Sequence, residues 1–266
     1  MDLRPALDIA SLTDPGKVRS HNEDSLAVDA EAGFVILADG MGGYNAGEVA
    51  SGIAVTMLSD SLKSALRGGL ADRETGSLVR AEIERTNAAI YQAAQSQPQF
   101  SGMGTTLVFA LFHDNRVTVA HIGDSRLYRY REARLEQVTR DHSLLQEQID
   151  SGMLSREDAR LSRNRNLVTR ALGVDPAVAA EIQEHAALPG DIYLLCSDGL
   201  NDMVGDEDIQ LTLGALGANP KLAASQLVRM ANDNGGRDNI SVILVRILRD
   251  FPANRGALAR LRTWLK

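Results

Sequence analysis

The aspartates at the ends of strand-like apolar runs are the residues best placed to do chemistry. Asp39 follows the run "FVILA" at residues 34–38, and three of the next four residues are glycines. A nucleotide-binding loop would need a Gly-x-Gly-x-x-Gly register, but Asn45 stands where the third glycine belongs, and no Gly-Lys-Ser/Thr follows. Asp39 could instead hold a cation, because the glycines leave room for backbone oxygens and a bulky anion.

Three further aspartates occupy similar positions and favour a shared metal site. A single aspartate at a strand end is usually a turn or helix-cap residue. Oxygen-only ligands suit Mg²⁺ or Mn²⁺ rather than zinc, which prefers His and Cys. One aspartate can bridge two such ions about 3.5–4 Å apart, and the ion pair can activate water for attack on phosphorus. The three aspartates are flanked by glycines: Asp124 in "HIGDSRLY", Asp198 after "DIYLLCS" and Asp238 before "NISVILV".

Short apolar runs and two long helical segments must position these aspartates. Runs rich in Val, Ile and Tyr predict strands, and the polar segments 113–115 and 131–134 predict hairpin turns with antiparallel pairing. Helical spacing predicts helices at 45–67, 74–96 and 219–232. Strands in meanders with grouped helices predict an α+β domain of two packed sheets with helices outside. The predicted strands are 34–38, 105–112, 116–122, 126–130, 191–196 and 240–248.

Composition excludes several classes of protein. The chain has 266 residues, 44% of them hydrophobic and 24% charged, which is ordinary for a globular domain. A net charge of -7 argues against nonspecific nucleic-acid binding as the main task. The single cysteine, Cys196, excludes an intrachain disulfide framework and a cysteine-rich zinc site. Since no apolar stretch approaches the roughly 20 residues of a membrane span, and the start does not read as a signal peptide, we expect a cytoplasmic protein.

Seven short motifs occur in the order found in bacterial members of the protein phosphatase 2C family, the metal-dependent PPM phosphatases, which the chain therefore resembles over residues 8–248. Each motif alone is weak, but the ordered set is specific. The resemblance implies a catalytic domain at 1–248 with a central antiparallel β-sandwich flanked by helices on both faces (αββα). It also implies hydrolysis of phosphoserine and phosphothreonine by direct attack of metal-bound water or hydroxide. The motifs are "RSHNED" (19–24), "ADGMGG" (38–43), "SGMGTTL" (101–107), "HIGDSRLY" (121–128), "TRDHSL" (139–144), "LLCSDGLND" (194–202) and "GGRDNISVILV" (235–245).

The resemblance implies a ligand set for two Mn²⁺ or Mg²⁺ ions. Asp39 resembles the residue that bridges both ions, and the backbone carbonyl of Gly40 resembles a ligand of the second ion. Asp198 and Asp238 resemble ligands of the first ion. Glu23 resembles the residue that supports the second ion, directly or through water.

Three more positions extend this site. Asp124, together with Asp198, resembles a weaker third-ion site of bacterial relatives. Asp24 is better explained as a residue that supports the metal ligands without binding an ion itself. Arg19 matches the arginine that binds phosphate in the family, and its fork of donors suits phosphate oxygens.

Met41 is a departure from many eukaryotic relatives, which have a histidine there that is proposed as general acid. A thioether cannot donate a proton, so the leaving group must be protonated by metal-bound water, another side chain or solvent. His21 and His142 are candidates, although a hydrogen-bonding role is the commoner one for an isolated histidine. His121 lies within a predicted strand and is expected to be structural.

Other classes of function fit less well. A cysteine phosphatase needs an arginine six positions after its nucleophile, and from Cys196 that position is Asp202. The segment around Ser125 lacks the second glycine of a serine-hydrolase elbow. A catalytically weak relative that acts as a phosphoprotein-binding module is the alternative, and metal-dependent turnover would distinguish the two. The complete set of Asp39, Asp198, Asp238 and Arg19 favours the enzyme.

Two segments outside the ligand set remain open. Residues 144–166 resemble the variable flap of the family, whose arginines could attract phosphopeptides or form an ordinary solvated helix face. The basic tail at 249–266 could form a short amphipathic helix around Trp264, for which we expect docking on its own domain or fraying rather than membrane contact. We expect a monomer whose partners are phosphorylated proteins, namely Ser/Thr kinases and their substrates. The flap arginines are Arg156, Arg160, Arg163 and Arg165.

Overall fold

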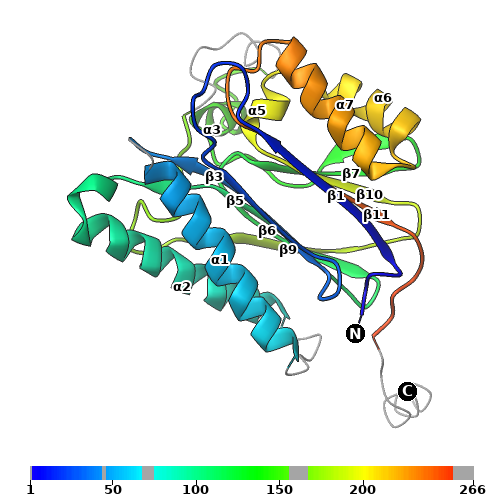
Figure 1. The fold of residues 1–266 in the computed structure, drawn as a ribbon, viewed down its shortest axis with the longest axis horizontal. Helices are drawn as coiled ribbons and strands as arrows, with labels where there is room; N and C mark the ends of the chain where they lie inside the picture. The colour runs from blue at the N-terminus through cyan, green and yellow to red at the C-terminus, as the bar shows by residue number, and fades with distance from the viewer. Residues whose placement is uncertain (1, 44–45, 68–74, 156–166, 254–266) are drawn as a thin grey trace.

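Two antiparallel sheets pack face to face, and helices cover both outer faces, in a computed structural model that describes residues 2–43, 46–67, 75–155 and 167–253 (Figure 1). The predicted four-layer α+β sandwich is confirmed. One sheet has the order β1 (Leu7–Asp14), β11 (Ile240–Ile247), β10 (Ile192–Cys196), β7 (Arg126–Arg131) and β8 (Arg134–Gln137). The other has the order β2 (Asp24–Asp29), β3 (Phe34–Met41), β5 (Leu107–His113), β6 (Arg116–Ile122) and β9 (Glu181–Ala186), with β4 (Gly104–Thr105) paired to β3.

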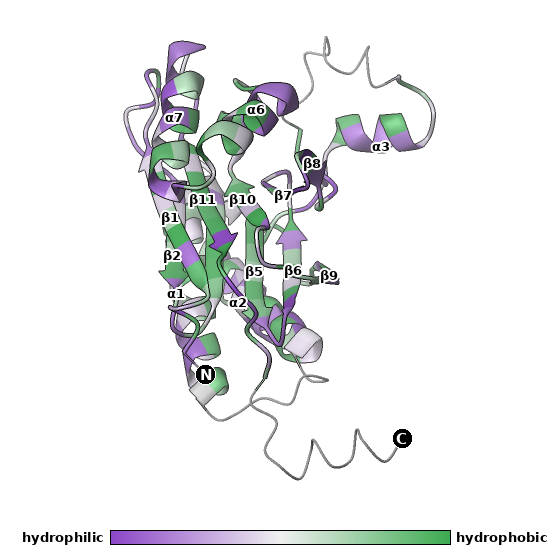
Figure 2. Ribbon diagram, turned by 90° about the vertical axis from the view of Figure 1, so that its right-hand side faces the viewer, coloured by the Kyte–Doolittle hydropathy of each residue, from purple (hydrophilic) through white to green (hydrophobic). Residues whose placement is uncertain are grey.

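The helices form two separate layers. On the sheet that contains β3 lie α1 (Ala46–Arg67) and α2 (Thr75–Ser96), which is followed by the 3₁₀ turn η2 (Pro98–Phe100). On the other sheet lie α5 (Asp198–Asn201), α6 (Asp206–Leu216) and α7 (Pro220–Asp233). The short helix α3 (Leu144–Asp150) stands apart beyond β8 and has no buried residue (Figure 2).

Strand β3 is buried on both faces, which explains its unbroken apolar sequence. Phe34, Ile36 and Ala38 pack in the core beneath α1 and α2, while Val35 and Leu37 pack in the core between the two sheets. Each buried side chain of this size contributes roughly 1.5–3 kcal/mol to folding. The strand therefore holds Asp39, near its end, on a rigid support.

Both predicted hairpin turns are confirmed. Asp114 and Asn115 join β5 to β6 with φ angles of 43° and 57°, and Glu132 and Ala133 join β7 to β8 with φ angles of 49° and 60°. Positive φ at both central residues is the signature of the type I′ turn, whose twist matches that of the flanking strands.

The predicted strand 105–112 is wrong at one residue, because the structure divides it into β4 and β5. Thr106 leaves the ladder, and its N–H donates to the backbone oxygen of Asp39 at 2.9 Å. The break thus contributes to the support of Asp39. The sequence analysis also missed β1, β2, β8, β9, α3, α5 and α6.

The first residues of the tail dock on the domain. Phe251 is 2% exposed and belongs to the core between the sheets. Its N–H donates to Asn115 Oδ1 at 2.6 Å, and the N–H of Ala253 donates to Asp114 Oδ1 at 2.8 Å. The flap arginines and Trp264 lie outside the described residues. Within the described chain, no helix is both long and apolar enough to cross a membrane.

Candidate metal centre

The structure brings the four predicted aspartates together at one end of the sandwich. Asp39 lies near the end of β3, and Asp198 is the first residue of α5, directly after β10. Asp238 precedes β11, and Asp124 lies in the loop between β6 and β7. Asp39 is close enough to Asp198, Asp124 and Asp238 for their charges to raise its pKa. Elements from both sheets therefore build a single acidic centre.

The electrostatics of this centre favour a bound cation. Burial and the neighbouring carboxylates, Asp24 first, raise the pKa of Asp39 well above its ordinary value. Burial and the charge of Asp124 likewise raise the pKa of Asp198 well above its ordinary value. Burial is also the main reason that the pKa of Asp24 and that of Asp124 rise to about 6. Carboxylates this close need either protons or a cation, and an all-oxygen set fits Mn²⁺ or Mg²⁺.

Asp24 lies directly behind Asp39. The two residues are opposite each other in the β2–β3 ladder. Ser197, the neighbour of Asp198, donates from its hydroxyl to Asp24 Oδ2 at 2.9 Å. The other oxygen, Asp24 Oδ1, is buried without a hydrogen-bond partner among the described residues. Asp24 thus connects Asp39 to the turn that carries Asp198.

Glu23 faces the first turn of α1. The backbone N–H groups of Gly47 and Glu48 lie near its carboxylate and act to lower its pKa, but burial is the largest effect and the pKa is raised. Gly40 donates its N–H to the backbone oxygen of Glu23 at 3.1 Å. A Cβ at Gly40 would lie 2.1 Å from the backbone oxygen of Gly47, so only glycine fits between β3 and the start of α1. Gly40 and Glu23 are therefore neighbours, on the α1 side of Asp39.

Arg19 contacts one of the predicted metal ligands. Its Nη2 donates to Asp238 Oδ2 at 2.7 Å, and this hydrogen bond raises the pKa of Arg19. The Arg19 side chain is 53% exposed, and it also lies within electrostatic reach of Glu23 and Asp198. A half-exposed guanidinium at the edge of the acidic centre is accessible to an anion from solvent.

A threonine and a serine that were not predicted link Asp39 to the Asp124 loop. The N–H of Asp39 donates to Thr106 Oγ1 at 3.0 Å, and the Thr106 and Ser125 hydroxyls are 2.7 Å apart. Thr105 adds a hydrogen bond from its hydroxyl to the backbone oxygen of Asp39 at 2.9 Å. The adjacent threonines in "SGMGTTL" were the only signal for this link in the sequence.

Asn239 was also missed, although it organises the loop that carries Arg19 and Glu23. Its Oδ1 accepts the N–H of Glu23 at 2.8 Å. Its Nδ2 donates to the backbone oxygens of His21 and Pro15, at 2.9 Å and 3.1 Å. The residue after Asp238 therefore fixes the loop that carries Arg19 and Glu23 beside Asp238.

The predicted histidine candidates differ in environment. His21 is exposed. His142 is 8% exposed, and burial together with His121 lowers its pKa to about 4. His121 donates from Nε2 to the backbone oxygen of Arg140 at 2.8 Å, which agrees with a structural role. Met41 stands opposite Gly104 in the β3–β4 pair.

Fold and site together define a metal-dependent phosphatase of the αββα sandwich class. Residues 17–244 match the family model described as Protein phosphatase 2C, and the chain belongs to this family. It is 41% identical over 239 residues to the serine/threonine phosphatase stp of Listeria welshimeri, with 88% of this chain and 93% of the relative covered. It is 40% identical over 248 residues to the phosphatase PstP of Mycobacterium tuberculosis; these cover 91% of this chain but 45% of that longer relative.

Solved structures agree with this assignment. The structure of the M. tuberculosis phosphatase PstP/Ppp superposes with a TM-score of 0.85 at 36% identity, covering 92% of this chain and 100% of that one. A structure of the PstP catalytic domain in complex with two manganese ions superposes with a TM-score of 0.82 at 36% identity, covering 91% and 99% of the two chains.

Proposed function

We propose that this protein serine/threonine phosphatase hydrolyses phosphoserine and phosphothreonine side chains at the Asp39 centre, with Mn²⁺ or Mg²⁺ bound there. One observation carries the proposal: Asp39 lies near the end of the doubly buried β3, where burial and the neighbouring charges of Asp24, Asp198, Asp124 and Asp238 raise its pKa. Such a carboxylate cluster is stable at neutral pH when divalent cations neutralise it.

Each carboxylate has a proposed place around two ions. Asp39 would bridge them, Asp198 and Asp238 would hold the first, and the Gly40 carbonyl with Glu23 would hold the second. Asp124 and Asp198 would hold a third ion more weakly. The bound cations would activate water for attack on phosphorus and neutralise phosphoryl charge.

Arg19 is proposed to bind and orient the phosphoryl group. Its guanidinium is half-exposed and stands beside Asp238, so its remaining donors can reach an anion above the carboxylates. A charge-assisted contact of this kind orients a phosphoryl group as well as attracting it.

The pairing of the first and last strands of one sheet supports the assignment of residues 1–248 to a single domain. β1 pairs with β11 over its whole length, so the two ends of the 1–248 segment close one sheet. We place the catalytic domain at 1–248, the flap at 144–166 and an appended tail at 249–266. The partners are phosphorylated proteins, with Ser/Thr kinases and their substrates as the expected class.

The test compares Asp39→Asn with Asp60→Asn, a control on the exposed side of α1. Phosphate release from a phosphothreonine peptide and from para-nitrophenyl phosphate is measured over a range of Mn²⁺ concentrations. Asp39→Asn should abolish turnover with the fold intact, because a neutral amide cannot hold two divalent ions together. Full activity of Asp39→Asn, or of thoroughly chelated wild type, would sink the two-ion mechanism. Peptide binding by the wild type without turnover would instead support the phosphoprotein-binding alternative.

A further inference from the structure

A second polar cluster, made of the buried His121 and His142 and the half-buried Glu181, adjoins the loop that carries Asp124. One nitrogen or oxygen atom from each of the three side chains lies within 4.8 Å of the others. The two imidazole rings stack with centroids 4.8 Å apart and planes 21° apart. Nε2 of His142 is buried without a hydrogen bond among the described residues, and it lies 3.7 Å from Glu181 Oε2.

The hydrogen bonds of His142 argue against a metal ion in this cluster. The N–H of Gly123 donates to His142 Nδ1 at 3.2 Å. A backbone amide can only donate, so Nδ1 must carry a lone pair, and in the neutral ring the proton sits on Nε2. A protonated Nε2 cannot bind a metal. The in-plane lone pairs of two nearly parallel stacked rings also cannot converge on one ion.

His142 instead holds both polar backbone groups of Gly123. While Nδ1 accepts the Gly123 N–H, the backbone N–H of His142 donates to the Gly123 oxygen at 2.9 Å. Gly123 has a φ of +100°, a conformation that L side chains rarely adopt, and a Cβ there would lie 2.7 Å from Thr106 Cγ2. The turn before Asp124 therefore depends on glycine and on the two contacts of His142.

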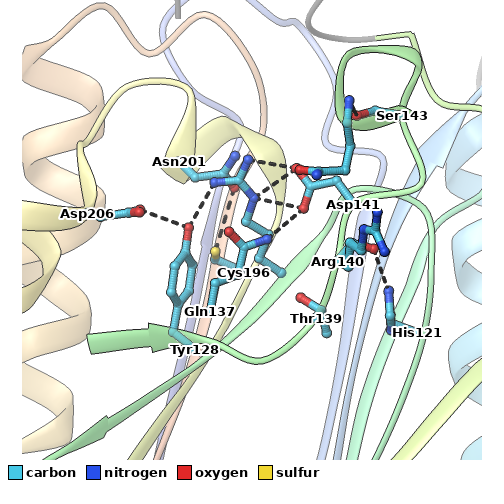
Figure 3. Close-up of polar contacts among 12 residues, drawn as sticks. His121, Tyr128, Gln137, Thr139, Arg140, Asp141, Ser143, Cys196, Asn201 and Asp206 are labelled. Carbon is cyan, nitrogen blue, oxygen red and sulfur yellow. Dashed lines mark hydrogen bonds and ion pairs between the residues drawn. The ribbon is translucent and has the colours of Figure 1, made fainter. Parts of the chain in front are cut away.

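The segment around His142 is itself anchored on both sides. His121 Nε2 donates to the backbone oxygen of Arg140 (Figure 3). Arg126 donates two parallel hydrogen bonds to Asp141, from Nε to Oδ1 at 3.0 Å and from Nη2 to Oδ2 at 2.7 Å. The backbone oxygen of His142 accepts the N–H of Thr169 at 2.8 Å. Residues 140–142 therefore contact His121 in β6, Gly123 in the loop and Arg126 in β7, and hold the 123–125 loop from both sides.

We propose that His142 is a positioning residue, whose Nδ1 holds the Gly123 turn so that the Asp124 carboxylate is directed toward Asp198. The proposal rests on the proposed function, in which Asp124 and Asp198 share an ion. Asp124 is the neighbouring charge with the largest effect on the pKa of Asp198, so the two carboxylates lie within electrostatic reach of each other. Burial and His121 lower the pKa of His142 to about 4, so Nδ1 keeps its lone pair at neutral pH.

The test uses a pair of variants that differ at the Nδ1 position. In His142→Asn, the amide oxygen takes the place of Nδ1 and can still accept the Gly123 N–H. In His142→Leu, a side chain of similar bulk offers no acceptor. Both variants keep the backbone bond to the Gly123 oxygen. Glu181→Gln is the matched control, because it changes the group that faces Nε2 and leaves the Nδ1 contact with Gly123 in place.

Three measurements decide the proposal. Exchange of the Gly123 amide proton and Mn²⁺ binding by calorimetry are followed in all variants, and ¹⁵N NMR reports the His142 tautomer in the wild type. His142→Leu should speed Gly123 exchange and weaken the weakest Mn²⁺ site, each by about tenfold, the typical effect of one lost hydrogen bond. His142→Asn should recover most of both losses, and Glu181→Gln should match the wild type. The wild-type ring should carry its proton on Nε2.

Contrary outcomes are separable by measuring Asp124→Asn in parallel. If Asp124→Asn weakens Mn²⁺ binding while His142→Leu does not, the positioning proposal alone is overturned. It is also overturned if His142→Asn is no better than His142→Leu, or if the NMR spectrum shows a proton on Nδ1. If Asp124→Asn leaves Mn²⁺ binding unchanged, the ligand role of Asp124 fails, and the positioning proposal fails with it.

Discussion

Arg19 Nη2 lies 2.7 Å from Asp238 Oδ2, so the residue proposed to bind phosphate is paired with a residue proposed to bind a metal ion. The Arg19 guanidinium and a divalent cation would compete for the negative charge of the Asp238 carboxylate. A cation at Asp238 would weaken the hydrogen bond between that carboxylate and Arg19, and would leave more of the Arg19 donors available for a phosphoryl group. Metal loading and phosphate binding are therefore expected to be coupled through this pair.

Replacing Arg19 should weaken catalysis without loss of metal. Loss of one charge-assisted contact of about 1.5–3 kcal/mol corresponds to a fall of roughly 10- to 150-fold in kcat/KM for Arg19→Ala. Mn²⁺ affinity should equal or exceed that of the wild type, because a competitor for Asp238 has been removed. Steady-state kinetics and calorimetry check both expectations, with Lys17→Ala as an exposed control. Loss of Mn²⁺ binding with a wild-type KM would show that Arg19 supports the metal instead.

Replacing Asp238 should have the opposite effect. Asp238→Ala removes a proposed ligand, so Mn²⁺ should bind more weakly and excess Mn²⁺ should restore part of the turnover. Asp233→Ala, a change at a more exposed aspartate in the same region, serves as the control. Activity and Mn²⁺ binding like those of the wild type in Asp238→Ala would remove Asp238 from the ligand set.

Stabilisation by Mn²⁺ should be larger at pH 7.5 than at pH 5. Burial raises the pKa of Asp24 and of Asp124 from 3.8 to about 6 in the folded chain. The folded state therefore binds more protons than the unfolded state between these values. Their contribution to the free energy of unfolding is present below about pH 4 and is lost as the pH rises through about 6.

Calorimetric melting at both pH values, with EDTA and with Mn²⁺, checks this expectation. Cations replace protons on the carboxylates, so binding at pH 5 must compete with protonation and should release protons. An equal rise in Tm at the two pH values would contradict the assignment of the raised pKa values to the metal centre.

The doubly buried part of β3 and the aspartate that follows its apolar run, Asp39, could be predicted from sequence, because burial on both faces requires an unbroken apolar run. The edge strand β9 could not, because its exposed face interrupts the apolar pattern in "EIQEHA". The helix α6 begins with three acidic residues and has only three buried ones, so its periodicity is equally weak.

Within the site, residue types were predictable but their partners were not. Arg19 and Asp238 are 219 positions apart, and Glu23 and Asn239 are 216 positions apart. No local pattern reports a hydrogen bond between such distant residues, since it arises only when both sheets are assembled. The same holds for Thr106, whose link to Asp39 depends on the break between β4 and β5.

The tail should divide into a structural part and a dispensable part at Ala253. Phe251 is buried in the core between the sheets, so Phe251→Ala should lower the free energy of unfolding by about 3–5 kcal/mol. Removal of residues 254–266 should leave turnover of para-nitrophenyl phosphate within a few-fold of the wild type, because every proposed ligand lies upstream. Leu248→Ala, a change at a side chain that is 47% exposed, is the control for the core substitution. Denaturant unfolding and turnover at saturating Mn²⁺ measure the two effects separately. A hundredfold loss of turnover in the shortened chain, with wild-type stability, would mean that the tail completes the site.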